Sequence, residues 1–288
     1  MALIIAMQIP KIILAIWREH AALKKIIHEH QPDLVISDNR FGLWSKKTKC
    51  VFITHQLMVK SPTALKFLEP LIQHIILSYA KKYDECWIPD VADEKNLSGD
   101  LSHKYPLPAN AKFIGLLSRF SSEQNIPALK KYDFLVLLSG TEPQRTVLEK
   151  ILTEQILKTN FRALIVRGVT EEQKQFSRQN NLTIVSYLNT EELIAAIHQS
   201  EIIICRPGYS TLMDLAATGK KAILIPTPGQ TEQEYLAEEL SGKNIFYSSP
   251  QKNFSLDEAI KAVNETTGLK KENFRCDIET AVTGLLKK

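Results

Sequence analysis

Four loops rich in hydroxyl, amide and charged side chains each follow an apolar, strand-like run in the second half of the chain. The loop at residues 205–221, "CRPGYSTLMDLAATGKK", offers the most chemistry. Gly208 lets a ligand approach the backbone closely, Ser210 and Thr211 carry hydroxyls, and the helix expected there presents free N–H groups that suit a phosphate. Asp214, about one turn further, could accept two hydrogen bonds from ribose hydroxyls. The alternative is that Ser210 and Thr211 only cap the helix and that Asp214 only interacts with the helix dipole.

A second loop, "LSGTEPQR", repeats the pattern at another strand end. Ser139, Gly140 and Thr141 follow the apolar run, and Arg145 lies about one turn into the expected helix. An arginine in that place can donate two parallel hydrogen bonds to a phosphate. The alternative is a surface ion pair between Glu142 and Arg145.

A third loop, "PTPGQTEQEYLA", carries Gln230, Glu232 and Gln233 into a helix. Side-chain amides both donate and accept hydrogen bonds, so they suit sugar hydroxyls, although polar residues here could also act as caps. The chain contains neither G-x-x-x-x-G-K-[ST] nor G-x-G-x-x-G. ATPase and dehydrogenase hypotheses therefore lose their usual support.

Two candidate acid/base residues lie in the first half of the chain. Asp38 ends the run "DLVISD", and His55 follows the run "CVFIT". Both would face a ligand at strand ends, where proton transfer to a substrate is feasible. A structural role is the alternative for each.

Apolar runs and helix-like segments alternate along the chain, which predicts an α/β fold with parallel sheets. Two such blocks, joined near residues 118–132, predict two Rossmann-like domains with ligands beyond the carboxyl ends of the strands. The expected strands span residues 33–38, 50–56, 85–89, 133–140, 161–168, 182–188, 201–208 and 221–226. The expected helices span residues 11–30, 65–83, 143–157, 170–179, 189–200, 232–242 and 274–288, with a further helix after residue 208.

Composition narrows the classes of partner and compartment. The chain has 288 residues and a net charge of +4, and no basic-aromatic module stands out, so we expect no nucleic-acid partner. Its four cysteines form no C-x-x-C pair, which favours free thiols in a reducing, cytoplasmic setting. The apolar start is interrupted by Gln8, Pro10, Lys11 and Arg18, too soon for a membrane span. It predicts a core helix or, alternatively, a helix lying on the inner face of a membrane.

Residues 205–237 resemble the donor-binding signature of the GT-B glycosyltransferases, and they are most similar to family 28. Arg206, Gly208 and Thr211 occupy the places of that signature, and Asp214 stands where the family usually has Glu. Of the family's sugar-reading Gln pair, which falls on Glu232 and Gln233, only the second residue is Gln.

The resemblance implies a role for each candidate residue. Asp214 would bind the ribose of a uridine nucleotide, Gly168 and Leu188 would lie at the uracil, and Gln230, Glu232 and Gln233 would contact the sugar. The residues implied at the donor diphosphate are Ser139, Gly140, Thr141, Arg145, Gly208, Tyr209, Ser210 and Thr211. His55 and Asp38 remain the catalytic candidates, and no metal or other cofactor is expected.

The resemblance also implies a GT-B architecture whose N-terminal domain is incomplete. Residues 1–120 would form the acceptor-side domain, residues 121–270 the nucleotide-sugar domain, and residues 271–288 a helix that packs back at the domain junction. A family N-domain opens with a strand and a Gly-rich loop, whereas this chain begins in what resembles a later helix of it. A mis-called start, a fragment and a real divergence all stay open.

The resulting hypothesis is a metal-independent, inverting glycosyltransferase. It would move a hexosamine, most simply N-acetylglucosamine, from a UDP-sugar to an unidentified acceptor, with a lipid-linked molecule as one candidate. One alternative is a UDP-sugar epimerase or hydrolase of the same fold. Another is a protein that binds nucleotide but is catalytically incomplete.

Overall fold

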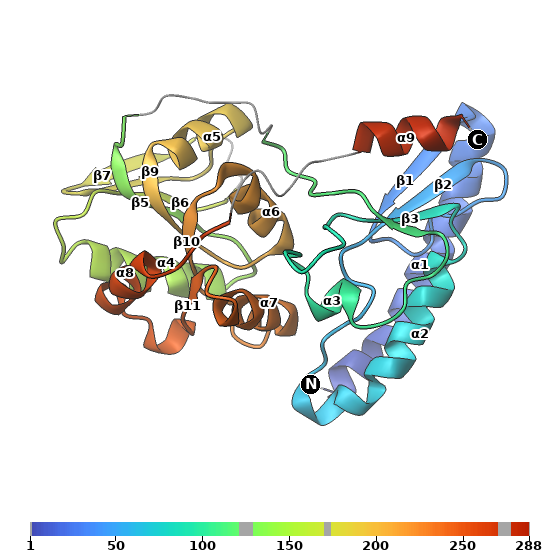
Figure 1. The fold of residues 1–288 in the computed structure, drawn as a ribbon, viewed down its shortest axis with the longest axis horizontal. Coiled ribbons are helices and arrows are strands. Elements are labelled where there is room, and N and C mark those ends of the chain that lie inside the picture. Colours follow the sequence, from blue (N-terminus) through green and yellow to red (C-terminus); the bar gives the residue numbers. More distant parts are fainter. Residues whose placement is uncertain (1, 121–128, 170–173, 270–277, 288) are drawn as a thin grey trace. The chain divides into compact units, whose positions relative to one another are not determined.

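The computed structural model describes residues 2–120, 129–169, 174–269 and 278–287. The chain divides into two compact units (Figure 1). Unit 1 comprises Met1–Leu117 with Arg275–Lys288, and unit 2 comprises Ser118–Phe274. Each unit has its own sheet and its own core, so each is described separately.

Unit 1 contains a four-stranded parallel sheet in the order β1-β2-β3-β4. One face packs on α2 through Phe52, Ile76 and Ile88, and the other packs on α9 through Trp87 and Leu285. Its elements are α1 (Ala2–His30), β1 (Leu34–Asp38), β2 (Lys49–Ile53), η1 (Thr63–Leu68), α2 (Glu69–Ala80), β3 (Glu85–Ile88), α3 (Asp100–His103), β4 (Ala111–Phe113) and α9 (Ile278–Leu286).

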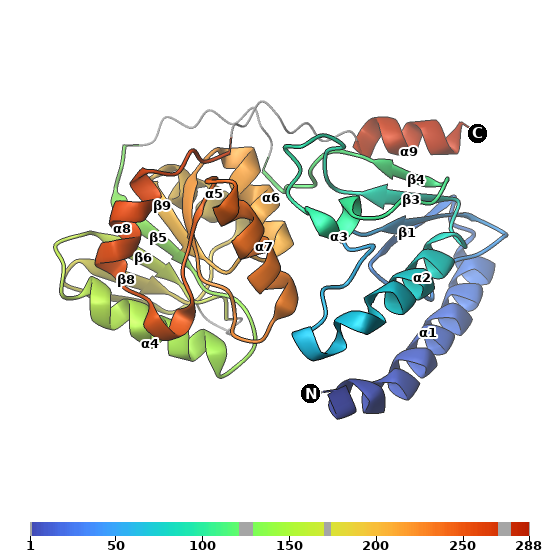
Figure 2. The same cartoon turned by 60° about the horizontal axis from the view of Figure 1, so that its bottom comes forward.

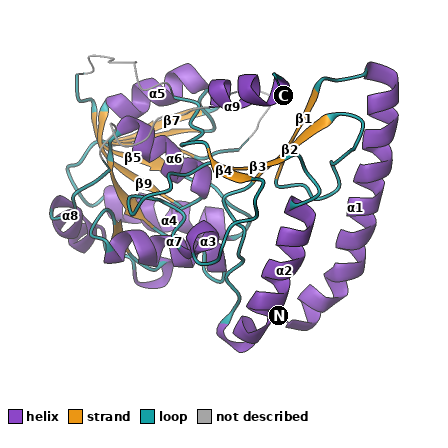
Figure 3. Cartoon of the chain, turned by 45° about the vertical axis from the view of Figure 1, so that its right-hand side comes forward, coloured by secondary structure: helices purple, strands orange, loops and turns teal. Residues whose placement is uncertain are grey.

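Helix α1 is long, runs alongside α2 (Figure 3), and is fixed to the loop that follows β1. Arg40 Nε donates to Glu19 Oε1 at 3.0 Å, and His20 Nδ1 lies 3.2 Å from the Gly42 carbonyl oxygen. Gly42 itself touches the helix: a Cβ there would lie 2.5 Å from the Ile16 carbonyl oxygen. Only a residue without a side chain allows this approach.

Unit 2 contains a seven-stranded sheet in the order β11-β10-β9-β5-β6-β8-β7, parallel except at β7. Helices cover both faces, with α4 and α8 next to each other on one of them (Figure 2). The elements are β5 (Tyr132–Leu137), α4 (Gln144–Ile156), β6 (Ala163–Val166), β7 (Phe176–Gln179), β8 (Leu182–Val185), α5 (Thr190–His198), β9 (Ser200–Cys205), α6 (Tyr209–Thr218), β10 (Lys221–Leu224), α7 (Thr231–Gly242), β11 (Tyr247–Ser248), η2 (Gln251–Asn253) and α8 (Leu256–Asn264).

The α/β class and the parallel sheets are as expected from the sequence, and one predicted helix is wrong. Within residues 170–179, Phe176–Gln179 forms an exposed edge strand, antiparallel to β8, and residues 170–173 lie outside the described residues. The polar segment is too short to bury a helical face, and the free edge of β8 satisfies its backbone instead. Strands β4 and β11 and helix α8 were not expected, and residues 121–128 and 270–277 of the expected linker and last helix are outside the described residues.

Helix α1 begins at Ala2, earlier than the expected residue 11. Large apolar side chains stay exposed on it, with Trp17 78% and Ile13 56% exposed. Among the described residues, no helix has the length and apolar character needed to cross a bilayer.

Two glycines in unit 1 give a matched test of the α1 contact. We expect Gly42→Ala to lower the thermal unfolding midpoint of unit 1, because the added methyl group meets backbone of α1. In Gly284→Ala, in α9, the added methyl group meets nothing within 4 Å. This variant should keep or raise the midpoint, because alanine is favoured over glycine inside a helix by about 0.5–1 kcal/mol. Calorimetry of both variants decides: equal midpoints would contradict the close contact.

Candidate functional site

The four loops singled out in the sequence lie at one edge of the unit 2 sheet. Strands β5, β6, β9 and β10 are mutually parallel, so their carboxyl ends point the same way. In sheets of this kind ligands bind at that edge. The loops are residues 138–143, 167–169, 206–208 and 225–230.

The start of α6 presents the backbone N–H groups of Ser210 and Thr211. Gly208 is the N-cap residue and makes no side-chain cap bond, and within the described part of the chain no side chain accepts either of these two N–H groups. The first intrahelical bond runs from the Leu212 N–H to the Gly208 carbonyl at 3.0 Å. Ser210 is exposed and Thr211 half-buried, whereas the ring of Tyr209 is 4% exposed and belongs to the core. Capping by Ser210 or Thr211, the alternative considered above, does not occur.

Asp214 lies one turn into α6 with both carboxylate oxygens engaged. Ser118 Oγ donates to Oδ1 at 2.7 Å, and Arg119 Nε donates to Oδ2 at 3.1 Å. The side chain is only 13% exposed. Burial raises the pKa of Asp214, although the hydrogen bonds and charge from Ser118 and Arg119 act to lower it. A ribose could reach this carboxylate only by sharing it with these two residues or displacing them.

The loop after β5 is open, but its arginine is committed to carboxylates. Ser139, Gly140 and Thr141 are exposed. Arg145 Nε donates to Glu142 Oε1 at 2.7 Å, and its Nη1 lies 3.2 Å from Glu149 Oε2. The ion pair considered as the alternative is therefore present, and Arg145 is also paired with a second carboxylate, that of Glu149.

The expected uracil residues lie on neighbouring segments. Gly168 has φ +68°, and a Cβ there would lie 2.5 Å from the Leu138 carbonyl oxygen, so glycine is required. The next residue, Val169, donates its N–H to the Ser186 carbonyl at 3.1 Å. Leu188 follows that segment and is half-buried. The two segments could contact one ligand group.

The loop after β10 uses its glutamine internally. Gln233 is 7% exposed, and its Oε1 accepts the Thr227 N–H at 2.8 Å. Gln230 is exposed at the N-cap of α7, and Glu232 is half-buried. Gln233 therefore holds the loop in place, and Gln230 is the amide open to a ligand. Thr227 is also 7% exposed, and its Oγ1 has no partner among the described residues.

Arg206 holds three segments of this edge together, a role that the sequence did not indicate. It is 1% exposed. Its Nη1 donates to the carbonyls of Ile225 and Pro226 at 2.9 and 3.0 Å, and its Nη2 donates to the Gln144 carbonyl at 3.0 Å and to Gln251 Oε1. Burial lowers the pKa of Arg206 to about 10, so it stays charged at neutral pH. The sequence signal was an arginine placed directly after a buried strand.

The catalytic candidates lie at the carboxyl edge of the unit 1 sheet. Asp38 ends β1 and is exposed, and His55 lies two residues beyond β2 and is half-buried. Asp90, which the sequence did not single out, is fully buried beyond β3 and accepts the Val91, Leu97 and Ser98 N–H groups. Burial alone would raise the pKa of Asp90, but hydrogen bonds from His103, Ser98 and Leu97 hold it below its usual value. Asp90 thus organises its loop.

Removing the Arg206 guanidinium should destabilise unit 2. Arg206→Ala leaves three backbone carbonyls and one amide oxygen without their donor. A single buried acceptor without a donor lowers the free energy of unfolding by about 1–3 kcal/mol. We expect a midpoint several degrees lower, at roughly 2–4 °C per kcal/mol, with Arg206→Lys in between because an ammonium group cannot span these acceptors. Arg178→Ala, at an exposed site, is the calorimetric control. A midpoint equal to that control would contradict the role of Arg206.

Comparison with known proteins shows to which family the chain is similar. Residues 134–283 match the glycosyltransferase family 28 C-terminal domain. An uncharacterized glycosyltransferase of Methanosarcina mazei is 22% identical over 246 residues, covering 78% of this chain and 63% of that protein. The UDP-N-acetylglucosamine–N-acetylmuramyl-(pentapeptide) pyrophosphoryl-undecaprenol N-acetylglucosamine transferase of Haemophilus influenzae is 24% identical, covering 77% and 60%. The chain thus spans about three fifths of the length of these curated relatives.

Solved structures support the fold. The S. aureus MnaA–UDP complex superposes with a TM-score of 0.61 at 10% identity, covering 94% of this chain and 78% of that one. Solved glycosyltransferases also match, which confirms the expected fold class. Because the family model spans more than half of the chain and includes the loops described above, the chain belongs to glycosyltransferase family 28.

Proposed function

We propose that the protein transfers a hexosamine, N-acetylglucosamine in the simplest case, from a UDP-sugar held by unit 2 to an acceptor hydroxyl. The observation that carries this proposal is the uncapped start of α6 with a buried carboxylate, Asp214, one turn further on. The relatives named for UDP-N-acetylglucosamine transfer support the choice of donor.

The donor diphosphate would be held mainly by backbone. Arg145 is paired with Glu142 and Glu149, so its charge is largely opposed. The N–H groups of Ser210 and Thr211 at the start of α6 and the exposed hydroxyls of Ser139 and Thr141 are open to an anion. These dipoles would stabilise the leaving UDP without reorganisation and without a metal ion. The Oγ1 of Thr227 would add a further donor.

The transfer would invert the anomeric carbon in one displacement. A base takes the proton of the acceptor hydroxyl, the oxygen attacks the anomeric carbon, and the bond to the diphosphate breaks, releasing UDP. His55 and Asp38 are the candidate bases in unit 1, because both lie at the carboxyl edge of its sheet. The exposed apolar side chains of α1, Trp17 among them, favour an acceptor presented at a membrane surface.

Two alternative functions can be distinguished from a transferase by their reaction products. A UDP-sugar epimerase or hydrolase would convert the UDP-sugar with no acceptor added, and a catalytically incomplete protein would bind UDP and release nothing. Incubation with UDP-N-acetylglucosamine alone, followed by analysis of the sugar and nucleotide, distinguishes an epimerase or hydrolase from a transferase. Release of UDP that requires an added acceptor distinguishes a transferase from a catalytically incomplete protein.

Calorimetric titration with UDP tests the donor site. We expect UDP to bind more tightly than ADP, and Asp214→Asn to weaken UDP binding by tenfold or more, because each lost hydrogen bond to a charged acceptor costs about 1.5–3 kcal/mol. Asp257→Asn, in the first turn of α8 and exposed, is a matched control that should bind as the parent does.

Two results of this titration would contradict the proposed donor site. If the folded protein binds no UDP, or if both asparagine variants bind it equally, residues 206–214 serve only the fold. Thermal unfolding midpoints equal to that of the parent in both variants would show that any loss of binding is not caused by unfolding.

A further inference from the structure

A second candidate site lies in unit 2, at the amino ends of its parallel strands. A cavity of about 260 Å³ opens where β5, β6 and β8 begin and where the antiparallel strand β7 ends. The loops assigned to the donor leave the opposite, carboxyl ends of β5 and β6, so the cavity is distinct from the candidate donor site. Its volume is close to the lower limit of about 300 Å³ for small-molecule sites, which favours a ligand with a single ring. The lining residues that carry the argument are Lys131, Tyr132, Arg162, Phe176, Arg178 and Thr183.

One wall of the cavity is the outer hairpin of the sheet. β7 is the edge strand (Figure 1), and Arg178 is directly opposite Thr183 of β8. Opposite residues of an antiparallel pair point to the same face, as do residues two apart on one strand, so Phe176 shares this face. The other face of β8 packs into the core through Leu182 and Ile184. The cavity face therefore brings a ring, a guanidinium and a hydroxyl together.

The charge around the cavity is positive. Among the described residues, Lys131 and Arg178 form no ion pair, and the Lys131 ammonium lies 5.2 Å from the centre of the Tyr132 ring. Arg162 Nε lies 3.9 Å from Asp133 Oδ2, which already accepts the Arg162 N–H at 2.6 Å. Three cations and one carboxylate leave about two positive charges. A phosphate monoester carries about two negative charges at neutral pH, so the two charges match.

Two helices end at this edge of the sheet, and the carboxyl end of a helix disfavours an anion. Their last carbonyls are already engaged. The Ile156 carbonyl of α4 accepts from Asn181 Nδ2 at 3.0 Å, and the His198 carbonyl of α5 accepts from Lys220 Nζ at 3.2 Å. An amide donor and an ammonium group thus offset the two helix dipoles, and the positive charge of the lining remains available.

A buried hydroxyl in the cavity awaits a partner, and the wall around it is already fixed. The Thr183 side chain is 8% exposed, and its hydroxyl makes no hydrogen bond among the described residues. A hydroxyl removed from water without a partner costs free energy, which a ligand oxygen would recover. Asn181 Nδ2 also donates to the Thr159 and Phe161 carbonyls at 2.9 and 2.7 Å, which fixes the segment before Arg162. A preformed site loses less entropy on binding.

We propose that this cavity, called here the amino-edge pocket, binds a small phosphate monoester that carries one aromatic ring. The phosphate lies among Lys131, Arg162 and Arg178. The Thr183 hydroxyl adds a donor, and the ring packs on Phe176. Guanidinium groups can bind a phosphate through two parallel hydrogen bonds, and contacts between aromatic rings add to apolar burial. The inference goes beyond the proposed function, because it uses no residue of the candidate donor site.

Isothermal titration calorimetry tests the pocket with two probes, phenyl phosphate and inorganic phosphate. We expect both to bind the full chain saturably, with phenyl phosphate binding more tightly. Arg178→Ala should weaken both about tenfold or more, because it removes charged hydrogen bonds to the phosphate. Phe176→Leu removes only the ring, so it should weaken phenyl phosphate about threefold or more and leave inorganic phosphate unchanged. Both residues are exposed, so the variants should keep the parent's unfolding midpoint.

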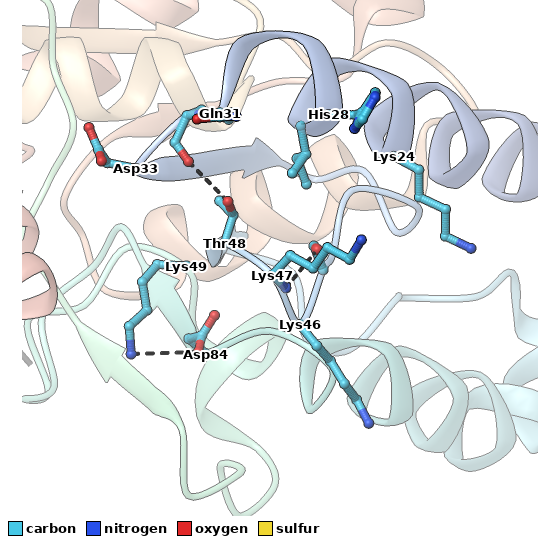
Figure 4. Close-up of a pocket in the computed structure, with 12 residues that line it drawn as sticks. Lys24, His28, Gln31, Asp33, Lys46, Lys47, Thr48, Lys49 and Asp84 are labelled. Atoms are coloured by element: carbon cyan, nitrogen blue, oxygen red, sulfur yellow. Dashed lines mark hydrogen bonds and ion pairs between the residues drawn. The ribbon is translucent and has the colours of Figure 1, made fainter.

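Three control variants separate the amino-edge pocket from other places where an anion could bind. Lys261→Ala removes one exposed cation from α8, on the other face of the sheet, and should bind both probes as the parent does. Asp214→Asn, at the candidate donor site, should also leave both affinities unchanged. Lys46→Ala/Lys47→Ala, at a basic cavity of unit 1 (Figure 4), should do the same.

Cytidine monophosphate identifies the kind of phosphate monoester, with Asp214→Asn as the titrated protein. Tighter binding of this nucleotide than of phenyl phosphate, lost when Arg178→Ala is added, supports the proposal with a nucleotide as ligand. Tighter binding of phenyl phosphate, lost in the same way, supports it with an aryl phosphate as ligand.

Four results would overturn the proposal. The folded protein binds neither phenyl phosphate nor cytidine monophosphate, or Arg178→Ala binds them as the parent does. Phenyl phosphate binds no more tightly than inorganic phosphate, so that the ring contributes nothing. Binding is lost in Lys46→Ala/Lys47→Ala, which would assign the probes to unit 1.

Discussion

The candidate donor site depends on the hydrogen bonds that the buried Arg206 guanidinium donates. Three loops that the chain makes far apart in sequence meet at the carboxyl edge of the unit 2 sheet, and backbone carbonyls from two neighbouring segments point inward to this one side chain. Carbonyls without donors would repel one another in a dry interior. A planar group with five donors satisfies several of them at once, and no apolar residue can do so.

This arrangement explains how the site can suit an anion although its arginines are occupied. Arg206 is turned inward, and Arg145 is held by Glu142 and Glu149. In the proposed donor site, the favourable potential for a diphosphate would come from oriented peptide dipoles at the start of α6. Such dipoles are fixed by the fold and carry no side-chain entropy, so they can recognise a charge without being consumed by a competing ion pair.

Sequence periodicity was sufficient to predict most strands and helices, because buried parallel strands are continuous apolar runs that alternate with helical segments. At α5 the sequence also shows a cap, the capping box of Asn189 and Glu192. It failed at Phe176–Gln179, where an unpaired strand edge, a feature of the sheet and not of the segment, decided the structure. The loops of the site were predictable as positions. The side-chain partners of Arg145, Gln233 and Arg206 were not, since they depend on which acceptors the fold brings within 3 Å.

The engagement of Asp214 has a thermodynamic consequence. Ser118 and Arg119 are the residues at which the chain passes from one unit to the other, and they hold the carboxylate assigned here to the ribose. In the proposed donor site, the ribose and the crossing segment would therefore compete for the Asp214 carboxylate. By linkage, any effect of a bound nucleotide on the freedom of that segment would be matched by an equal effect of the segment on the affinity for the nucleotide. In that proposal the crossing point of the chain is an energetic partner of the nucleotide as well as a covalent tether.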